Sequence, residues 1–386
     1  MGALPAYAAP AGGTTGDHDA AAINLRRPAA VRACGDLKPD PTASSKPQLC
    51  RLDPAQLSAA AQASIAPQQK KAAAATLAVQ CALNALDTDR TTSCINTELA
   101  YDIFIPQTGE VIGTAAFQAV FVGVLDVRSR EWNQRAEVTL LYAEAAAAPG
   151  FLGFATAIFP DGAGFTATES EYLEVTTVGV QVDFPYTVTS AGPATVQGHV
   201  EPDFVLTPLV PVESPPLQYY ITPAPSVRCD STPNVGPATG GCVYNEFTPT
   251  YNVSTTNPDT AQVAWHILWA QRNLINHWGW QGHGPALTRT RNQALITANR
   301  RVACGNRRPR PGLSCDEYPF ASTQQGASLN PDYSWHMLNA RQNSLEGSRY
   351  RRPWYIQNRM LENDDLWVNV VLPAGTTVTQ IPGFPN

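Results

Sequence analysis

The eight cysteines of this chain constrain its fold more than any other feature. They lie in four close pairs, at positions 34 and 50, 81 and 94, 229 and 242, and 304 and 315. Eight cysteines allow on the order of 100 connectivities, but this spacing favours bonds between sequence neighbours. None of the pairs has the C-x-x-C spacing of zinc or redox sites. We therefore predict the disulfides Cys34–Cys50, Cys81–Cys94, Cys229–Cys242 and Cys304–Cys315, and a secreted, extracellular protein.

The length of the chain and its apolar content predict two or three folded domains. It has 386 residues, of which 44% are hydrophobic, enough for separate cores. No apolar run approaches the roughly 20 residues of a membrane-spanning helix, so we expect no membrane span. Residues 1–50 are rich in Ala, Gly, Pro and Thr and predict a flexible leader. The opening MGALPAYAAPAGG is typical of the end of an export signal.

The texture of the sequence changes several times and predicts an α+β protein. Residues 51–97 indicate helices, with Asp53 as an N-cap and a division at Pro67. Residues 98–205 hold short Val-, Phe- and Thr-rich runs and predict an antiparallel β sandwich-like domain that serves as a binding module or spacer. Residues 206–250 predict a proline-rich linker that carries one disulfide. Residues 251–386 predict a second domain, with helices over 257–274 and 288–306.

The charge of the chain is unevenly distributed. Residues 251–386 contain 13 Arg, no Lys and 8 acids, a net charge of +5, which leaves −11 for residues 1–250 within the total of −6. Guanidinium groups suit bidentate contacts with phosphate. The arginines therefore indicate either a phosphate-binding surface or an ordinary solvated basic face.

Two adjacent acids, Asp316 and Glu317, stand in a rigid context between Cys315 and the run Tyr318-Pro319-Phe320. A carboxylate is costly to bury unless a cation, a metal or several donors meet it. Adjacent residues of a strand point in opposite directions, so we expect these acids to have different partners. The residues alone leave open whether those partners are arginines, a turn or a metal.

The stretch 315–323, CDEYPFAST, preceded by ANRRVACGN at 298–306, resembles the signature of the NucA/NucB deoxyribonuclease family. Other stretches are similar to family elements in the same order: 258–261 leading to His266, then Asn343, Trp354 with Asn358 and Arg359, and 366–370. The resemblance covers about residues 250–386. It implies a small α+β ββα-metal (His-Me finger-like) nuclease domain in a secreted, nonspecific, metal-dependent endodeoxyribonuclease.

The resemblance also implies roles for individual residues. Asp316, Glu317 and His266 become catalytic candidates, and Asp316, Glu317, Asn343 and Asn358 become candidate ligands of Mg²⁺ or Mn²⁺, which prefer oxygen donors. The candidate nucleic-acid-binding residues are the arginines of the C-terminal region, namely Arg300, Arg301, Arg307, Arg308, Arg310 and Arg359.

One departure from the family pattern leaves alternatives open. Gln325-Gly326-Ala327 stands where the family usually has Glu-Gly-Gly, and Gln342-Asn343 followed by Glu346-Gly347 stands where relatives often show Glu-Asn and then Gln-Gly-Gly. A family acid has thus moved or been lost. We expect a monomeric enzyme that acts on DNA. The alternatives are a catalytically impaired nucleic-acid-binding protein, or a nuclease toxin with an N-terminal delivery or attachment region and an immunity protein or cell-wall partner.

Overall fold

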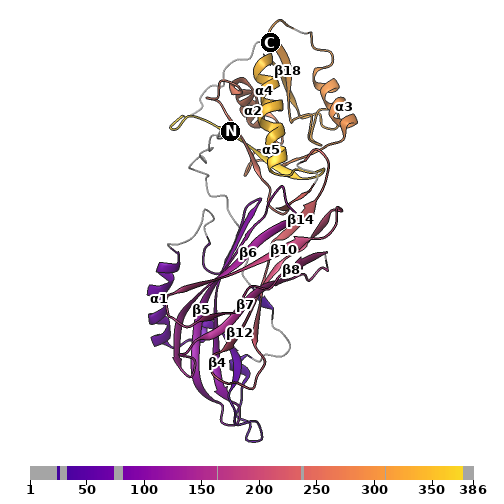
Figure 1. The fold of residues 1–386 in the computed structure, drawn as a ribbon. Coiled ribbons are helices and arrows are strands. Elements are labelled where there is room, and N and C mark those ends of the chain that lie inside the picture. Colours follow the sequence, from indigo (N-terminus) through magenta and orange to yellow (C-terminus); the bar gives the residue numbers. More distant parts are fainter. Residues whose placement is uncertain are drawn as a thin grey trace, which may run out of the picture.

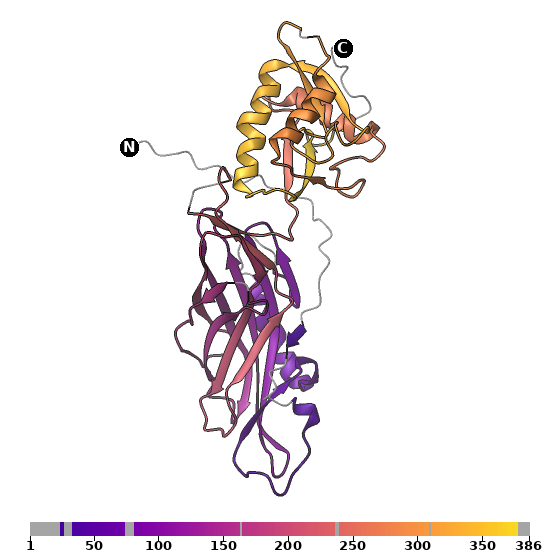
Figure 2. The ribbon, with the colours of Figure 1, turned by 90° about the vertical axis from the view of Figure 1, so that its right-hand side faces the viewer.

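The computed structural model describes residues 24–26, 33–73, 81–162, 164–235, 239–308 and 310–376. Most of the predicted leader lies outside these ranges. Residues 33–50 are described, and they contain the start of the strand Gln48–Leu52 and the disulfide Cys34–Cys50, so the prediction of a flexible leader is corrected for this part. Figures 1 and 2 show an elongated molecule with two regions stacked end to end: a long β-rich region formed by the earlier residues, and a smaller α+β region formed by the later ones. No helix among the described residues is both long enough and apolar enough to span a bilayer.

The β-rich region consists of antiparallel sheets packed face to face. One sheet has the strand order β2-β4-β5-β6-β10-β8, with β3 also paired to β4, and another has the order β1-β13-β12-β7-β9. Phe117 of the first sheet contacts Phe151, Phe204 and Tyr219 of the second, with ring centroids 5.1 to 5.9 Å apart. The antiparallel sandwich-like prediction is therefore confirmed.

The strands of the first sheet are β2 (Gln48–Leu52), β3 (Ala85–Thr88), β4 (Thr92–Ile105), β5 (Glu110–Val124), β6 (Glu131–Ala145), β8 (Phe165–Ala167) and β10 (Gln181–Ser190). Those of the second are β1 (Asn24–Arg26), β7 (Phe151–Ile158), β9 (Leu173–Val175), β12 (Glu201–Pro208) and β13 (Leu217–Thr222). A small third sheet, in the order β11-β14-β15, joins β11 (Val196–His199), β14 (Ser226–Asp230) and β15 (Gly241–Tyr244).

The structure corrects the prediction of two N-terminal helices. Asp53 caps only a short 3₁₀ turn, Pro54–Gln56, and a single helix, α1 (Ala59–Ala73), runs through Pro67. Residues 74–80 of the expected second helix lie outside the described residues, and residues 85–88 and 92–97 belong to β3 and β4. Pairing of β3 with β4 outweighs the helical propensity of this Ala- and Leu-rich stretch.

The structure also corrects the prediction of a linker over 206–250. This range contains strand β13, which pairs with β12 of the sandwich, and strands β14 and β15, which pair with each other in the small third sheet. Leu217, Tyr219 and Ile221 alternate along β13 and are fully buried in its core. The many prolines lie mostly between these strands, so the range belongs to the β-rich region.

The C-terminal region combines short sheets with helices. Strands β16 (Thr250–Ser254), β20 (Asp365–Val371) and β17 (Leu287–Thr288) form one sheet, in which β16 and β20 are parallel, and β18 (Leu313–Tyr318) and β19 (Ser334–Asn339) form a hairpin. The predicted helices appear as α2 (Ala261–Asn273) and α3 (Gln293–Cys304). A continuous helical run follows β19: α4 (Ala340–Leu345), the π-helical η3 (Glu346–Arg351) and α5 (Arg352–Gln357).

Buried ion pairs join the two regions. Asp364, beside β20, accepts from Arg90 Nη2 at 2.8 Å and from Arg228 Nη2 at 2.9 Å, and both arginines come from the β-rich region. In the opposite sense, Arg359 Nε lies 2.8 Å from Oδ2 of Asp230 on β14. The prediction that Arg359 binds nucleic acid is therefore corrected: its side chain is fully buried and paired between the regions.

Each disulfide joins the sequence neighbours that the spacing predicts. The bonds are Cys34–Cys50, Cys81–Cys94, Cys229–Cys242 and Cys304–Cys315. The last connects the final residue of α3 to β18, and it therefore anchors the strand that carries Asp316 and Glu317. Four disulfides are consistent with an extracellular protein.

Candidate active site

Asp316 is held in place by a buried chain of hydrogen bonds. Its Oδ2 lies 2.7 Å from Nδ1 of His266 on α2, and Nε2 of that imidazole lies 2.9 Å from the hydroxyl of Ser334 on β19. The His266 side chain is fully buried, with both ring nitrogens engaged. The prediction that His266 is catalytic required its side chain to reach the substrate. The buried imidazole does not, so this prediction is corrected. The position of the imidazole instead fixes the orientation of the Asp316 carboxylate.

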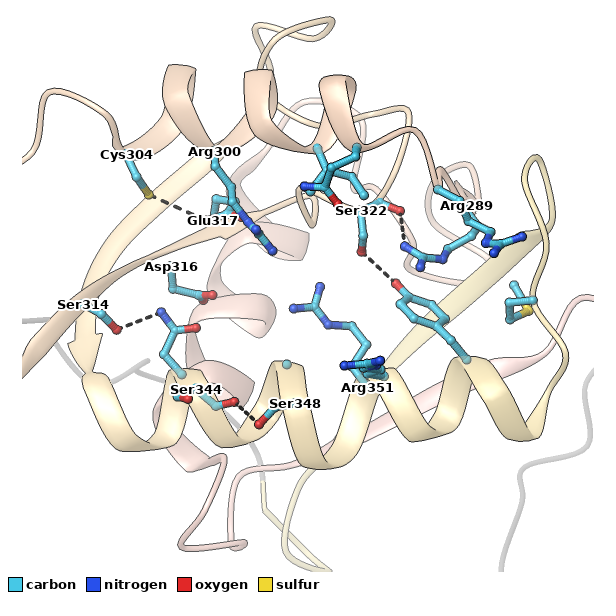
Figure 3. A pocket seen from close by; sticks show the side chains of 18 of the residues that line it. Arg289, Arg300, Cys304, Ser314, Asp316, Glu317, Ser322, Ser344, Ser348 and Arg351 are labelled. Atoms are coloured by element: carbon cyan, nitrogen blue, oxygen red, sulfur yellow. Dashed lines mark hydrogen bonds between the residues drawn. The ribbon is translucent and has the colours of Figure 1, made fainter. Parts of the chain in front are cut away.

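A groove of about 970 Å³ runs past both acids. Figure 3 shows it between α3 on one side and the helical run of α4, η3 and α5 on the other, with β18 alongside. Asp316 and Glu317 both line it. Its lining also includes five arginines: Arg289, Arg291, Arg300, Arg351 and Arg352. Of these, only Arg300 was singled out by sequence reasoning.

Glu317 has a different environment from Asp316, as expected for neighbours on a strand. Its Oε2 lies 3.6 Å from the sulfur of Cys304. Burial and the negative charge of Asp316 raise the pKa of Glu317 to about 7, against the opposing effect of Arg351 and Arg300. A carboxyl group with a pKa near neutrality can take up and release a proton under physiological conditions.

A buried acid and its arginine complete the helical wall of the groove. Glu346 Oε2 lies 3.0 Å from Nη2 of Arg351, and its Oε1 accepts from the Tyr251 hydroxyl at 3.1 Å. The guanidinium of Arg351 also stacks 3.8 Å from the centre of the Phe320 ring. Burial raises the pKa of Glu346. This pair holds Arg351 in the groove, close enough to influence Glu317.

Sequence reasoning missed Arg351 because of the local helix geometry. Glu346 and Arg351 are five residues apart, which places them on different faces of an α-helix, where neighbours are three or four residues apart. The π-helical segment Glu346–Arg351 has i→i+5 hydrogen bonds and brings the two side chains together. No pattern in the sequence predicted this π-helical segment.

The oxygen donors along the groove fit a hard divalent cation. Besides Asp316 and Glu317, the amide of Asn343 on α4 lines the groove, and its Nδ2 donates to Ser314 Oγ and to the Cys315 carbonyl, each at 3.0 Å. These two bonds use the Nδ2 group of Asn343 and leave its side-chain oxygen, Oδ1, to bind a ligand. Mg²⁺ is commonly held by one or two carboxylates, with water and phosphate oxygens completing its shell.

The predicted ligand Asn358 is not brought to this site. It ends α5, its Nδ2 donates to the Trp354 carbonyl at 2.9 Å, and it is not among the groove-lining residues. The metal prediction for Asn358 is therefore corrected, because its amide closes the end of the helix.

The remaining predicted arginines, Arg301, Arg307, Arg308 and Arg310, lie outside the groove lining. Arg307 stacks on Trp335 at 3.8 Å from the ring centre, and the other three are exposed. Their role in nucleic-acid binding stays a prediction.

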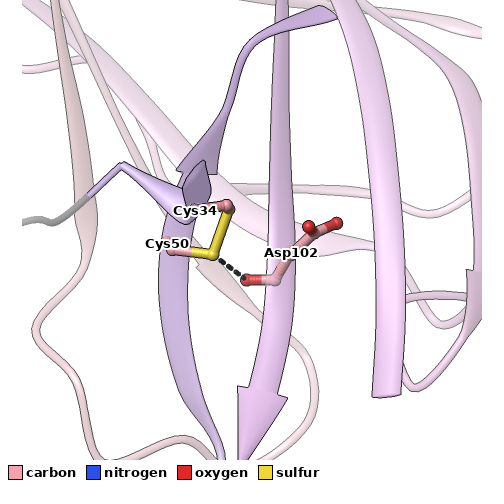
Figure 4. Close-up of side chains that lie close together, drawn as sticks. All are labelled: Cys34, Cys50 and Asp102. Atoms are coloured by element: carbon pink, nitrogen blue, oxygen red, sulfur yellow. Dashed lines mark hydrogen bonds between the residues drawn. A yellow bond between two sulfur atoms is a disulfide. The ribbon is translucent and has the colours of Figure 1, made fainter. Parts of the chain in front are cut away.

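Among the described residues, only Cys34, Cys50 and Asp102 bring three His, Cys, Asp or Glu ligand atoms within 4.8 Å of one another. Figure 4 shows the two sulfurs joined in a disulfide beside Asp102. Metals bind the thiolate form of cysteine, so this group is not a metal site. A metal at Asp316 would accordingly take at most two carboxylates from the residues that the structure describes.

An α+β region that presents two adjacent carboxylates to an arginine-lined groove has the features of a phosphodiester-cleaving hydrolase. Residues 277–368, within the C-terminal region, match the model of the family described as Deoxyribonuclease NucA/NucB. The match indicates a deoxyribonuclease. It includes β18, the helical run and most of β20, but not α2 with His266 or the β-rich region. No curated protein and no solved structure matches the chain.

Proposed function

We propose that this protein is a secreted, nonspecific endodeoxyribonuclease that requires Mg²⁺ or Mn²⁺ to hydrolyse DNA phosphodiester bonds. The observation that carries the proposal is the placement of Asp316 and Glu317 together in the arginine-lined groove of a region that matches a deoxyribonuclease family. The consecutive elements β18, β19 and α4, with Asp316 on the first strand and Asn343 on the helix, support a ββα-metal nuclease arrangement.

The residues of the groove divide the chemistry among them. Asp316 and Asn343 would hold the divalent cation, which would polarise the phosphodiester and lower the pKa of a bound water. His266 keeps the Asp316 carboxylate in one orientation through its Nδ1 bond. Glu317, whose pKa is about 7, is suited to accept the proton of the attacking water on a carboxylate oxygen. Arg351 and Arg300 offset the charge of the phosphate.

The proposal is tested with supercoiled plasmid DNA and the full chain. We expect nicking and linearisation in Mg²⁺ or Mn²⁺, none in EDTA, and none by Asp316→Asn in any buffer. Arg349→Gln is the matched control, because Arg349 is exposed on the helical run and is not part of the groove lining. Cleavage by Asp316→Asn that also survives EDTA would overturn the mechanism.

A second candidate, a DNA-binding protein without cleavage activity, has one observation in its favour. Gln325 and Gln342 stand at positions where the family often has Glu. Gln342 Oε1 accepts from the Gln262 main-chain N–H at 2.8 Å, and Gln325 Oε1 accepts from the Thr288 main-chain N–H at 2.9 Å. Both amides have structural partners. Retardation of DNA in a gel by the wild type, without cleavage in either metal, would favour this candidate.

A further inference from the structure

The groove that contains Asp316 extends to the junction with the β-rich region. In Figure 3 Arg289 lies at the opposite end of the groove from Ser314 and Asp316. The lining there includes Asn234 and Val235, which follow β14 and belong to the β-rich region. The groove is thus formed by both regions.

The Arg289 guanidinium is held by an aromatic ring and a main-chain carbonyl, and the charge of Glu362 acts on it without an ion-pair contact. Its guanidinium stacks 4.0 Å from the centre of the Tyr355 ring and donates from Nη1 to the Ser322 carbonyl at 3.1 Å. Its Nε is buried and has no acceptor among the described residues. Buried polar groups almost always have a hydrogen-bond partner, so this N–H group is a candidate for contact with a ligand.

Arg291 lies beside it and is fixed by the β-rich region. Its Nη2 donates to the Pro233 carbonyl at 2.8 Å. The nearby acid Glu362 is already engaged, since its Oε1 accepts from the Thr290 hydroxyl at 2.8 Å and its Oε2 from the Arg291 main-chain N–H. Across the described part of the chain, no carboxylate lies within ion-pairing distance of the Arg289 or Arg291 guanidinium.

We propose that Arg289 and Arg291 form a second phosphate-binding subsite, which holds a backbone phosphate of the same nucleic-acid strand away from the one at Asp316. Guanidinium groups present several N–H donors in a plane and suit phosphate oxygens. Because Pro233 fixes Arg291, the β-rich region shapes this subsite. The inference rests on the proposed nuclease function. It implies that substrates with several phosphates bind better than substrates with one.

The experiment compares two substrates in Mg²⁺ or Mn²⁺: a single-stranded oligodeoxynucleotide of about 12 residues, which spans several phosphates, and bis(p-nitrophenyl) phosphate, which has one. For Arg289→Gln and for Arg291→Gln we expect KM for the oligonucleotide to rise about tenfold with kcat nearly unchanged. The rate on bis(p-nitrophenyl) phosphate stays within about twofold of wild type, since phosphate contacts away from the chemistry contribute to binding.

Two variants are needed because Arg289 also packs on Tyr355, and its loss could disturb folding, which circular dichroism would detect. The Arg291 side chain makes one contact described above, the hydrogen bond to the Pro233 carbonyl, so its loss should disturb folding less. Arg291→Lys keeps the charge and restores part of the affinity. Arg349→Gln, which alters an arginine outside the groove lining, leaves both substrates unaffected. An unchanged oligonucleotide KM in folded variants, or equal losses on both substrates, overturns the subsite.

Binding in EDTA separates this inference from the proposed function. Fluorescence anisotropy with a 5′-fluorescein-labelled oligonucleotide measures Kd without cleavage. We expect each Gln variant to weaken binding about tenfold and to reduce the salt dependence by about 0.7 in log Kd per log salt. If the wild type cleaves nothing, the nuclease proposal fails, and the subsite still stands or falls on this Kd. Equal Kd values for wild type and both variants would remove it.

Discussion

Each region of the molecule contains a carboxylate beside a disulfide, and the two carboxylates differ in what surrounds them. In the sandwich, Asp102 on β4 lies next to Cys34–Cys50 (Figure 4). It is 6% exposed and accepts from the Thr114 hydroxyl at 2.7 Å. In the C-terminal region, Glu317 lies next to Cys304–Cys315. Burial is the main cause of a raised pKa for both acids.

The difference shows that burial and a raised pKa do not by themselves make a site. Asp102 stands on a strand paired on both sides, with β2 and β5, and its neighbour Thr114 satisfies one oxygen. Glu317 has a second acid beside it, lines an open groove, and is influenced by Arg351 and Arg300. Perturbed acids gain functional meaning where ligand space and cations are also present.

The largest expected effect comes from removing one acid in each region. Asp316→Asn should lower plasmid cleavage by about 10³-fold or more, since it removes the negative charge proposed to hold the metal. Asp102→Asn should stay within about twofold, because Asn can still accept from Thr114. Both are measured as initial nicking rates with Mg²⁺. Equal losses from the two variants would contradict the contrast drawn between them.

The junction between the regions should carry the next largest effect. Arg359→Met leaves Asp230 buried without its cation and should lower the free energy of unfolding by about 3–5 kcal/mol. The matched control is Arg341→Met, which breaks an ion pair with Asp259. Because the arginine side chain of this pair is 67% exposed, its loss should cost far less. Denaturant unfolding measures both. Similar costs for the two variants would mean that the buried pairs do not couple the regions.

Substitution of His266 should weaken activation by Mn²⁺ more than its effect on protein stability explains. His266→Asn removes the imidazole that binds Asp316, and we expect it to weaken Mn²⁺ activation by about 10 to 100-fold. Ser334→Ala removes only the hydrogen bond between Ser334 and His266. The measurement is nicking rate against Mn²⁺ concentration, with unfolding followed in parallel. A lower maximal rate at unchanged half-saturation would argue against a role in orienting Asp316.

The pH dependence gives the smallest expected effect. With the pKa of Glu317 at about 7, kcat/KM in Mg²⁺ should rise about tenfold between pH 6 and pH 8 as the carboxyl ionises. Because this pKa is raised above the unfolded value, ionisation opposes folding from about pH 4.5 upward. Glu317→Gln should therefore remove the rise in activity yet increase stability at pH 8 in EDTA. A flat wild-type profile would show that Glu317 does not titrate in this range.

Much of the C-terminal region could be predicted from sequence, because its signals are local. Helix α3 begins at the cap Asn292, whose side chain accepts from the Ala294 and Leu295 main chains, and ends before Gly305. The cysteine spacing predicted all four disulfides. The stretch around Asp316 predicted the family, and the match over 277–368 confirms it. Each of these signals lies within a short stretch of chain.

The errors occurred where distant residues decide the outcome. The supposed linker became strands because Leu217, Tyr219 and Ile221 complete a core built by strands earlier in the chain. Arg359 resembles a surface arginine in sequence, but Asp230, 129 positions earlier, and the carbonyls of Val127 and Val235 bind it in the buried interface. His266 resembles a catalytic histidine in sequence, but its two ring nitrogens bond to Asp316 and Ser334, which lie 50 and 68 positions away.

The sequence by itself determined the disulfide framework, the nuclease family of the C-terminal region and the pair of acids at its centre, since spacing and short motifs encode these. Tertiary structure alone decided which arginines line the groove. Arg351 reaches the groove through a π-helical segment, and Arg291 is fixed by a carbonyl from the other region. The position of a charged side chain depends on the partners that satisfy it, and folding brings those partners from distant parts of the chain.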